Sequence, residues 1–408
     1  MFKAIVYSLY FIFAILLNSV GILIQRSINL YGVSHSQAGN LEGFKDISIA
    51  VVSFFAGMML PKLGYKKGLI FGLLLVLSGC INMYFANSFW AVKILFACVG
   101  ISFALVKVAV YALVSSYSTS NESLNKFLST VESVFMVGIA TAYIVFPLFY
   151  SDQHPDKWLN IYLLLSVLTV AVIIMVLFQD FGQYEFYDVG TKISDINTQA
   201  KIVSQPLVLI FALCAFFYVM TEQGIMSWLP TFNEKVLNLP EKLSVNMAVI
   251  LALSIALGRL VAGRLGQLVP WIRILLFCLA VAFLMIVFIL PLTGKIQPGE
   301  IKGFGDIPLI AFIFPLIGLF LAPIYPLMNA AVLAVTDKDK LTQMAGILTF
   351  FSALGGTLGS KITGVLFEKI GGANAFYFGL IPLFLLSIFL YLLHMKTNYG
   401  AKDFQSQN

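Results

Sequence analysis

Long apolar runs alternate with short polar stretches along the whole chain, and the runs are far longer than the strands of a membrane barrel. A helix needs about 20 apolar residues to cross the hydrocarbon of a bilayer. By this measure six runs precede the polar segment 180–204 and six follow it. The predicted spans are 4–26, 41–61, 69–87, 89–116, 127–150, 158–179, 205–230, 244–265, 271–293, 307–334, 342–366 and 375–394.

The polar segment divides the chain into two halves with equal numbers of spans. We expect an N-terminal six-helix bundle at 1–179, a central cytoplasmic loop at 180–204, a C-terminal six-helix bundle at 205–394 and a cytoplasmic tail at 395–408. The predicted fold class is an all-α membrane protein with twelve transmembrane helices in two bundles. Chains of two membrane bundles usually move a solute between the bundles.

Composition supports the membrane assignment and excludes other classes. The chain is 60% hydrophobic and 11% charged, whereas a soluble protein carries about 25% charged residues. The net charge is +6 with the basic residues scattered, which does not indicate nucleic-acid binding. The four cysteines lie inside apolar runs and are expected to be small buried side chains. The sequence has no P-loop, metal-ligand cluster or nucleophile motif, so we expect no enzyme, no cofactor and no direct ATP-driven pump.

The distribution of lysine and arginine predicts the orientation. The first apolar run follows Lys3 and continues to about Gln25 without a small-residue cleavage site, so we interpret it as the first span and not as a signal peptide. With the N-terminus inside, the inner segments hold 13 basic residues and the outer segments hold 7. We therefore expect a monomeric protein of the cell (inner) membrane with both termini in the cytoplasm.

The connection between the second and third predicted spans carries a recognisable motif. It reads FAGMMLPKLGYKKGLIFGL over residues 55–73. This stretch resembles the short cytoplasmic loop of major facilitator superfamily transporters, particularly the fucose permease branch of fucose, galactose and glucose symporters. The matching positions are Gly57, Lys62, Gly64, Lys66 and Lys67, and Pro61 stands where the wider superfamily has an acidic residue.

Two further stretches are similar to the same branch, at 216–230 (FFYVMTEQGIMSWLP) and 318–326 (GLFLAPIYP). The resemblance implies the major facilitator fold and proton symport of a sugar. The branch also carries one carboxylate in its first span and one in its fourth. By alignment they correspond to Gly21 and Lys107 here, so the resemblance does not transfer that pair of carboxylates.

Ionisable residues inside a span are costly and invite a functional interpretation. Lys107 has no charged residue within eight positions on either side. We expect it to project into the central cavity and to contact an anionic group of the solute; the alternative is a structural ion pair with Glu132 on the next span. The complete set of such residues is Arg26, Glu42, Lys45, Asp46, Lys107, Glu132, Glu222, Arg259 and Lys361.

The seventh predicted span contains the second candidate for solute binding. Glu222 has the polar or aromatic neighbours Tyr218, Gln223 and Trp228, which suit stacking and hydrogen bonding to a polar solute. A packed aromatic face is the alternative. The expected substrate-binding set is Lys107, Glu222, Gln25, Tyr218, Trp228, Tyr325 and Asn329; the expected proton-coupling residues are Glu222, Glu132 and Asp46.

Two ion pairs between the halves are predicted to gate the cavity. In the major facilitator layout the fifth and eighth spans face each other, as do the second and eleventh. Glu132 and Arg259 would pair near the cytoplasmic side, and Asp46 and Lys361 near the outer side; Glu132 with Lys107 is the rival of the first pair. Arg26, Glu42, Lys45 and Asp46 lie near the outer ends of their spans, where snorkelling to the interface is the alternative to a functional role.

The sequence therefore predicts a secondary active transporter for a small polar organic solute, driven by a proton or another ion. The surplus of fixed cations favours an anionic solute such as a sugar acid or other carboxylate. A neutral-sugar:proton symporter is one alternative. A multidrug or metabolite exporter is another, because the 37 phenylalanines permit an apolar cavity. A sensor or scaffold would usually carry a soluble output domain, and no soluble segment is long enough for one.

Overall fold

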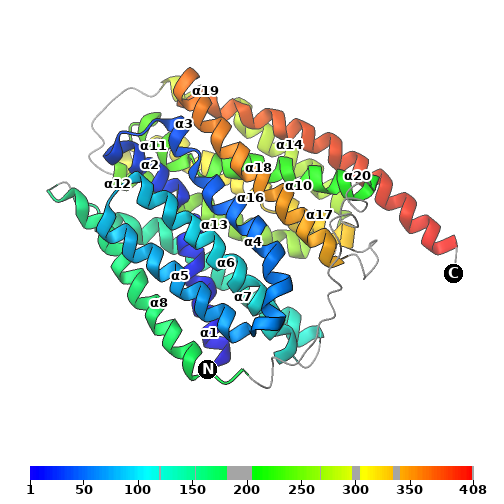
Figure 1. The fold of residues 1–408 in the computed structure, drawn as a ribbon. Coiled ribbons are helices and arrows are strands. Elements are labelled where there is room, and N and C mark those ends of the chain that lie inside the picture. The colour runs from blue at the N-terminus through cyan, green and yellow to red at the C-terminus, as the bar shows by residue number, and fades with distance from the viewer. Residues whose placement is uncertain are drawn as a thin grey trace. The chain divides into compact units, whose positions relative to one another are not determined.

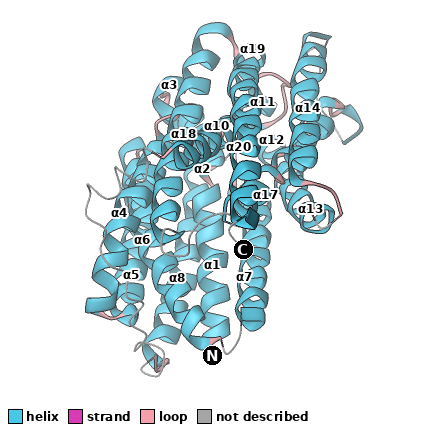
Figure 2. Ribbon diagram, turned by 90° about the vertical axis from the view of Figure 1, so that its right-hand side faces the viewer, coloured by secondary structure: helices cyan, strands magenta, loops and turns pink. Residues whose placement is uncertain are grey.

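The structure is a computed structural model that describes the chain except residues 119–120, 152, 182–204, 267, 296–303, 334–340 and 407–408. The described residues form helices with short connections, and none of them lies in a β-strand (Figures 1 and 2). The all-α prediction is therefore confirmed. The predicted central loop 180–204, including Lys192, lies almost entirely outside the described residues.

The first half contains six spans in the predicted order. The first span is broken into two helices, and each of the next five is one long helix. The helices are α1 (Phe2–Asn18), α2 (Val20–Tyr31), α4 (Leu41–Leu63), α5 (Tyr65–Ala86), α6 (Phe89–Tyr117), α7 (Asn121–Val145) and α8 (Asn160–Phe178). Short elements connect them, namely α3 (His35–Ala38), η1 (Phe146–Phe149) and η2 (Pro155–Leu159).

The second half is more interrupted. Its helices are α10 (Pro206–Met226), α11 (Leu229–Lys235), α12 (Glu241–Met247), α13 (Val249–Leu265), α14 (Trp271–Ile289), α15 (Ile310–Ile313), α16 (Ile317–Leu321), α17 (Ile324–Leu333), α18 (Leu341–Ile370), α19 (Gly372–Phe376) and α20 (Leu380–Ser406). The 3-10 turns are η3 (Leu290–Lys295), η4 (Phe304–Asp306), η5 (Phe314–Leu316) and η7 (Tyr377–Gly379).

The described helices account for the twelve predicted spans. Ten are long and apolar enough to cross a membrane, and α1 with α2, bent by 41°, makes an eleventh. The twelfth is α4, which has 23 residues and carries Glu42, Lys45, Asp46 and Lys62. Its length is sufficient to cross the hydrocarbon of a bilayer.

By its internal contacts the chain forms two compact units. Unit 1 is Met1–Val33 with Leu41–Ile193, and unit 2 is Ser34–Asn40 with Ser194–Asn408. The short segment Ser34–Asn40 thus packs with the second half although it is flanked in sequence by α2 and α4 of the first. The sequence-based division had assigned these residues to the N-terminal bundle.

Equivalent helix pairs hold each unit together. The first span packs on the fifth, as α1 on α7 and α10 on α18, and the second packs on the fourth, as α4 on α6 and α13 on α16. Glycines allow the first kind of contact: a Cβ on Gly138 of α7 would meet the backbone of Phe11, and one on Gly355 of α18 would meet the backbone of Phe216. Small residues let membrane helices approach closely in this way.

The glycine-rich turn of the sequence motif has a local physical explanation. Gly64 precedes α5 with φ 91°, a conformation that residues with a Cβ rarely adopt. Two residues later, the Lys66 ammonium donates to the carbonyls of Leu177 at 2.8 Å and Gln179 at 2.9 Å. These carbonyls end α8, where the helix leaves acceptors unsatisfied. The motif therefore turns the chain and caps a neighbouring span.

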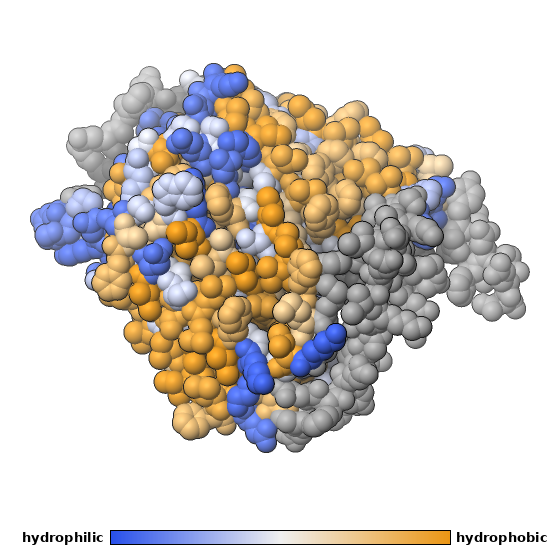
Figure 3. Space-filling view, viewed as in Figure 1, coloured by the Kyte–Doolittle hydropathy of each residue, from blue (hydrophilic) through white to orange (hydrophobic). Residues whose placement is uncertain are grey.

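Large apolar side chains cover the outer faces of the spans. On α5, Phe71 is 60% exposed and Phe85 is 77% exposed; on α8, Val167 is 66% exposed. The face of unit 1 that carries these helices is mostly hydrophobic (Figure 3). Such a surface suits contact with lipid and would be unusual on a soluble monomer.

Candidate functional site

The polar cluster of unit 1 is built from its first, fourth and fifth spans. Lys107 lies on α6, ten residues before its last residue, Tyr117. The Glu132 carboxylate of α7 interacts electrostatically with the Lys107 ammonium. It interacts in the same way with the hydroxyls of Tyr10 and Tyr111. Among the described residues, Lys107 and Glu132 are too far apart for a direct ion pair, but their charges still influence each other. The two charges thus share one polar region inside a single unit.

Aromatic rings line the same region of unit 1. The Lys107 ammonium lies 5.9 Å from the ring centroid of Phe103, one helical turn away on α6. Phe103 in turn contacts Tyr10 at 6.2 Å, Phe13 at 5.6 Å and Phe135 at 6.3 Å between centroids. Rings of this kind offer faces for stacking and for cations. The rings of Phe103, Tyr10, Phe13 and Phe135 therefore form an aromatic cluster beside the Lys107 ammonium.

The polar cluster of unit 2 centres on Glu222 of α10. The Tyr218 hydroxyl donates to the Glu222 carboxylate at 2.7 Å, four residues apart on one helix face. The ring of Tyr218 lies 5.6 Å from that of Tyr325 on α17, tilted by 31°. The predicted substrate-binding residues Glu222, Tyr218 and Tyr325 therefore lie together.

Three more polar side chains surround this pair of tyrosines. The Tyr325 hydroxyl lies beside Asn329, one turn along α17, and beside Ser352 of α18. Arg259 of α13 acts electrostatically on both Tyr218 and Tyr325, as Glu222 does. Unit 2 thus also brings one cation and one carboxylate together beside two tyrosines. The residues of this cluster come mainly from the first, fourth and fifth spans of the second half, as in unit 1. Arg259 comes from the second span of that half.

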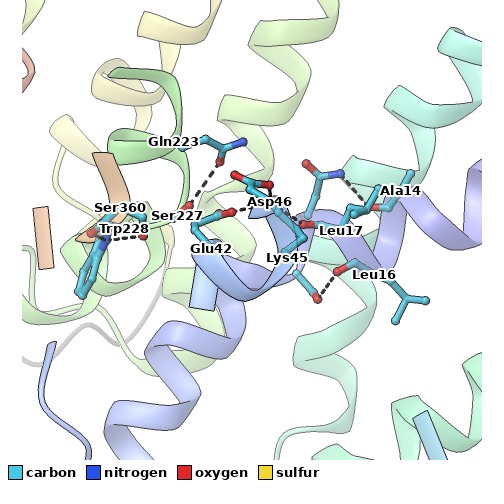
Figure 4. A network of polar contacts seen from close by, with 12 residues as sticks. Ala14, Leu16, Leu17, Glu42, Lys45, Asp46, Gln223, Ser227, Trp228 and Ser360 are labelled. Atoms are coloured by element: carbon cyan, nitrogen blue, oxygen red, sulfur yellow. Dashed lines mark hydrogen bonds and ion pairs between the residues drawn. The ribbon is translucent and has the colours of Figure 1, made fainter. Parts of the chain in front are cut away.

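A buried ion cluster lies near the start of α4. The Lys45 ammonium is 2.6 Å from Glu42 and 3.4 Å from Asp46, and it donates to the carbonyl of Leu17 at 3.5 Å (Figure 4). The break in the first span, where α1 ends before Ser19, exposes such carbonyls. Snorkelling to the interface does not describe these groups, since Glu42 and Lys45 are 1% and 5% exposed.

Arg26 and Gln25 are also buried, at the middle of α2. The Arg26 guanidinium donates to the carbonyl of Pro155 at 3.1 Å and lies 4.4 Å from the ring centroid of Tyr150 and 5.6 Å from that of Trp158. Gln25 is 1% exposed. Arg26 thus ties α2 to the connection before α8, which is a structural role within unit 1.

Trp228 and Lys361 have structural contacts within unit 2. The Trp228 indole N–H donates to the carbonyl and the hydroxyl of Ser360 at 2.9 and 3.2 Å (Figure 4), and the side chain is 0% exposed. The place of Trp228 in the substrate-binding set stays a prediction. The Lys361 ammonium donates to the carbonyl of Ser36 at 2.7 Å and to its hydroxyl at 3.0 Å.

Each predicted gating pair has one residue in unit 1 and one in unit 2. The pairs are Glu132 with Arg259 and Asp46 with Lys361, and both stay predictions. All four groups interact with residues of their own unit. For Glu132 that interaction is with Lys107, the rival partner.

Sequence reasoning missed Tyr10, Tyr111 and Ser352 as members of the clusters. A signal was present for Tyr111, which lies four residues after Lys107 and so on the same helix face. Tyr325 and Asn329 are related in the same way. Tyr10 and Ser352 have no such spacing to a charged residue, because only packing between helices brings them to the clusters.

These observations define a membrane protein of two six-span units, each with an internal polar cluster. A sequence model of the Major Facilitator Superfamily matches residues 5–299 and 301–407. The chain therefore belongs to this superfamily of transporters. A curated relative, described as a TsgA homolog protein of Buchnera aphidicola subsp. Acyrthosiphon pisum, is 20% identical over 384 residues, or 91% of each chain.

Solved structures show the same fold. The E. coli fucose:proton symporter FucP aligns at 16% identity with a TM-score of 0.62, over 96% of this chain and 98% of that one. The nucleoside transporter NupG aligns at 12% identity with a TM-score of 0.76, over 96% and 100%. A bacterial homolog of the lysosomal transporter Spinster aligns at 14% identity with a TM-score of 0.69, over 99% and 98%. The expected major facilitator fold, like that of the fucose symporter, is confirmed.

Proposed function

We propose that the protein is a secondary active transporter of a small polar organic solute, coupled to protons and working by alternating access. The observation that carries this proposal is the repetition of one kind of polar cluster on equivalent spans of both units. Lys107 with Tyr10 and Tyr111 offers polar groups for the solute in unit 1, and Glu222 with Tyr218 offers them in unit 2. Repeated halves with membrane-buried polar groups are the usual setting of a transporter's solute site.

The local charges favour a solute without net charge. The anionic expectation rested on an excess of cations in the spans, but three of these cations, Lys107, Arg259 and Lys45, have carboxylates in the same region. Lys107 shares its region with Glu132, and Arg259 shares its region with Glu222. Lys45 lies between two carboxylates. A neutral sugar, the first alternative from the sequence, therefore suits the clusters better than a sugar acid.

The aromatic rings and polar side chains of the two clusters indicate which kind of solute they suit. Tyr218 with Tyr325 and Phe103 with Tyr10 offer paired ring faces, and Asn329 with Ser352 offers hydrogen bonds. Sugars present both a flat apolar face and hydroxyls. The names of the similar structures, a fucose:proton symporter and a nucleoside transporter, agree with a ring-bearing polar solute.

Glu222 is the carboxylate best placed to couple transport to protons. It accepts a hydrogen bond from Tyr218, so its protonation would change the geometry of a residue that contacts the solute. Asp46 is less suitable, because it already pairs with Lys45 in a buried cluster that also contains Glu42. Glu132 is the second candidate, through its interaction with Lys107.

The proposed setting is the cell (inner) membrane, with both termini in the cytoplasm and the protein as a monomer. This orientation rests on the excess of basic residues in the inner segments. Cysteine labelling near Lys396 with an impermeant reagent tests it: labelling from outside intact cells would overturn the orientation.

A ligand panel tests the function directly. The purified protein is screened by thermal shift against neutral hexoses, nucleosides, sugar acids, other carboxylates and hydrophobic drugs, and each hit is tested for uptake into liposomes with an inward proton gradient. We expect a neutral ring-bearing solute to stabilise the protein and to accumulate. Tyr218→Phe should weaken binding, and Tyr84→Phe on α5, outside both clusters, should not. Stabilisation by carboxylates alone, or by drugs alone, would overturn the neutral solute.

A further inference from the structure

The segment Ser34–Asn40 is held on unit 2 by an interface that the transport function does not explain. It follows Gly32, whose φ of 62° ends α2, and contains the one-turn helix α3. Ser34 caps this turn by accepting from the backbone N–H of Gln37 at 3.2 Å, and the Gln37 side chain accepts from the backbone N–H of Ser34 at 3.3 Å. The segment is thus a preformed compact turn.

Three aromatic rings fix the turn to unit 2. The His35 imidazole stacks on Phe367 of α18 at 5.1 Å and 17°, and on Trp228 at 6.0 Å and 26°. Trp228 and Phe367 stack on each other at 5.4 Å. Since Ser360 takes the indole N–H, the orientation of Trp228 is fixed before the turn packs on it.

Polar contacts and close backbone packing complete the interface. The Lys361 ammonium donates to the Ser36 carbonyl at 2.7 Å, and the Ser36 backbone N–H donates to the Glu368 carboxylate at 3.1 Å. A Cβ on Gly364 of α18 would lie 2.6 Å from the His35 carbonyl and 2.6 Å from the Trp228 ring. Gly364 is therefore required for the turn to dock.

We infer that Ser34–Asn40 is a latch, which docks on Trp228 and α18 and is released when His35 becomes protonated. Val33 and Leu41, which flank the segment, belong to unit 1. The docked turn therefore ties the residues between α2 and α4 to unit 2. The inference goes beyond the proposed function and does not depend on the solute.

The electrostatic surroundings of His35 determine the direction of the pH effect. Burial in the ring stack lowers the pKa of His35; the Glu368 carboxylate opposes this shift, and Lys235 on α11 adds to it. Lys361 on α18 is the other charged group at the docked turn. Because docking favours the neutral imidazole, the latch is most stable above the ordinary histidine pKa of about 6.5 and weakens as the pH falls below it.

A cysteine at Ala38 reports release of the latch. Ala38 is 0% exposed in the docked turn, so Ala38→Cys, with the four native cysteines changed to serine, should react with a maleimide only after release. Labelling is measured on purified protein in nanodiscs, and each rate is divided by that of the denatured protein at the same pH. Gly364→Ala should accelerate labelling by roughly five- to hundredfold, as expected for one extra carbon in a packed interior.

Two matched controls make the test decisive. Gly346→Ala is the same change on the same helix with nothing within 4 Å of the new Cβ, and it should leave the rate unchanged. In the Ala38→Cys parent the normalised rate should rise between pH 7.5 and 5.5, while His35→Phe, which keeps a stacking ring, should remove that rise. Equal rates for Gly364→Ala and Gly346→Ala would overturn the latch. A pH response that persists in His35→Phe, or its absence from the parent, would overturn the role of His35.

Discussion

The two units place similar polar clusters on helices of very different continuity. In unit 1 the fourth span is α6, one helix of 29 residues that carries Lys107. In unit 2 the equivalent span is divided into α15, η5, α16 and α17; α16 and α17 are labelled in Figure 1. Pro315, Pro323 and Pro326 lie in this stretch, and proline removes a helical hydrogen bond and disfavours a straight helix.

This difference indicates a division of labour between the units. A continuous helix holds the Lys107 ammonium at a fixed position, whereas a divided helix lets Tyr325 and Asn329 shift relative to Glu222. We propose that the first unit provides a rigid surface for the solute and that the second provides the part that responds to solute and proton. Broken helices at solute sites are common in transporters.

Removing the charge of Glu222 tests the responsive half and should have the largest effect. We expect Glu222→Gln to abolish accumulation against a gradient while exchange continues, since the amide still accepts from Tyr218 but binds no proton. Accumulation and exchange are measured in liposomes with the solute identified by the ligand panel. Glu234→Gln on α11, where the carboxylate contacts Lys235, is the control. If Glu222→Gln still concentrates the solute, the coupling carboxylate is Glu132 or Asp46.

Removing the charge of Lys107 tests the rigid half. Uptake efficiency should fall by roughly 10- to 150-fold in Lys107→Ala, the range for losing a hydrogen bond to a charged group. Lys107→Arg should also be impaired, because a planar guanidinium does not replace a compact ammonium. Lys93→Ala on the same helix, where the ammonium lies 4.1 Å from the Trp90 ring centroid, should transport normally. Normal uptake by well-expressed Lys107→Ala would remove Lys107 from the solute site.

Charge reversal decides whether Glu132 acts within its unit or between units. If Glu132 gates the cytoplasmic side with Arg259, the double variant Glu132→Arg with Arg259→Glu should recover transport that either single variant loses. If its interaction with Lys107 is the important one, Glu132→Lys with Lys107→Glu should recover instead. Uptake by the four single and two double variants distinguishes the pairs. The interbundle gate is rejected if only the second pair recovers.

The smallest effect is expected from removing one hydroxyl. Tyr218→Phe keeps the ring that faces Tyr325 but loses the 2.7 Å hydrogen bond to Glu222. Solute affinity should fall by about tenfold, and the pH dependence of uptake should shift because the carboxylate loses a donor. Calorimetric titration and uptake at several pH values measure the two changes. An unchanged pH profile would show that Tyr218 does not act on the coupling carboxylate.

The sequence by itself determined the class and the number of spans of this protein. Runs of about 20 apolar residues have few stable outcomes other than membrane helices, because the backbone polar groups must be satisfied within each segment. The charges inside those runs also stood out, since few residues there are ionisable. Spacing along one helix further related Tyr218 to Glu222, because positions four apart share a face.

Tertiary structure alone decided which groups meet. Tyr10, Ser352 and the Leu17 carbonyl beside Lys45 lie on other helices than the groups that they meet, and helix packing leaves no local sequence pattern that identifies them. The same is true of Ser34–Asn40, whose docking on unit 2 depends on a gap at Gly364 and on the rings of Trp228 and Phe367. Apolar periodicity determines that a segment is a helix and which face is buried. Contacts between helices depend on side-chain shape over long separations in the chain, which periodicity does not encode.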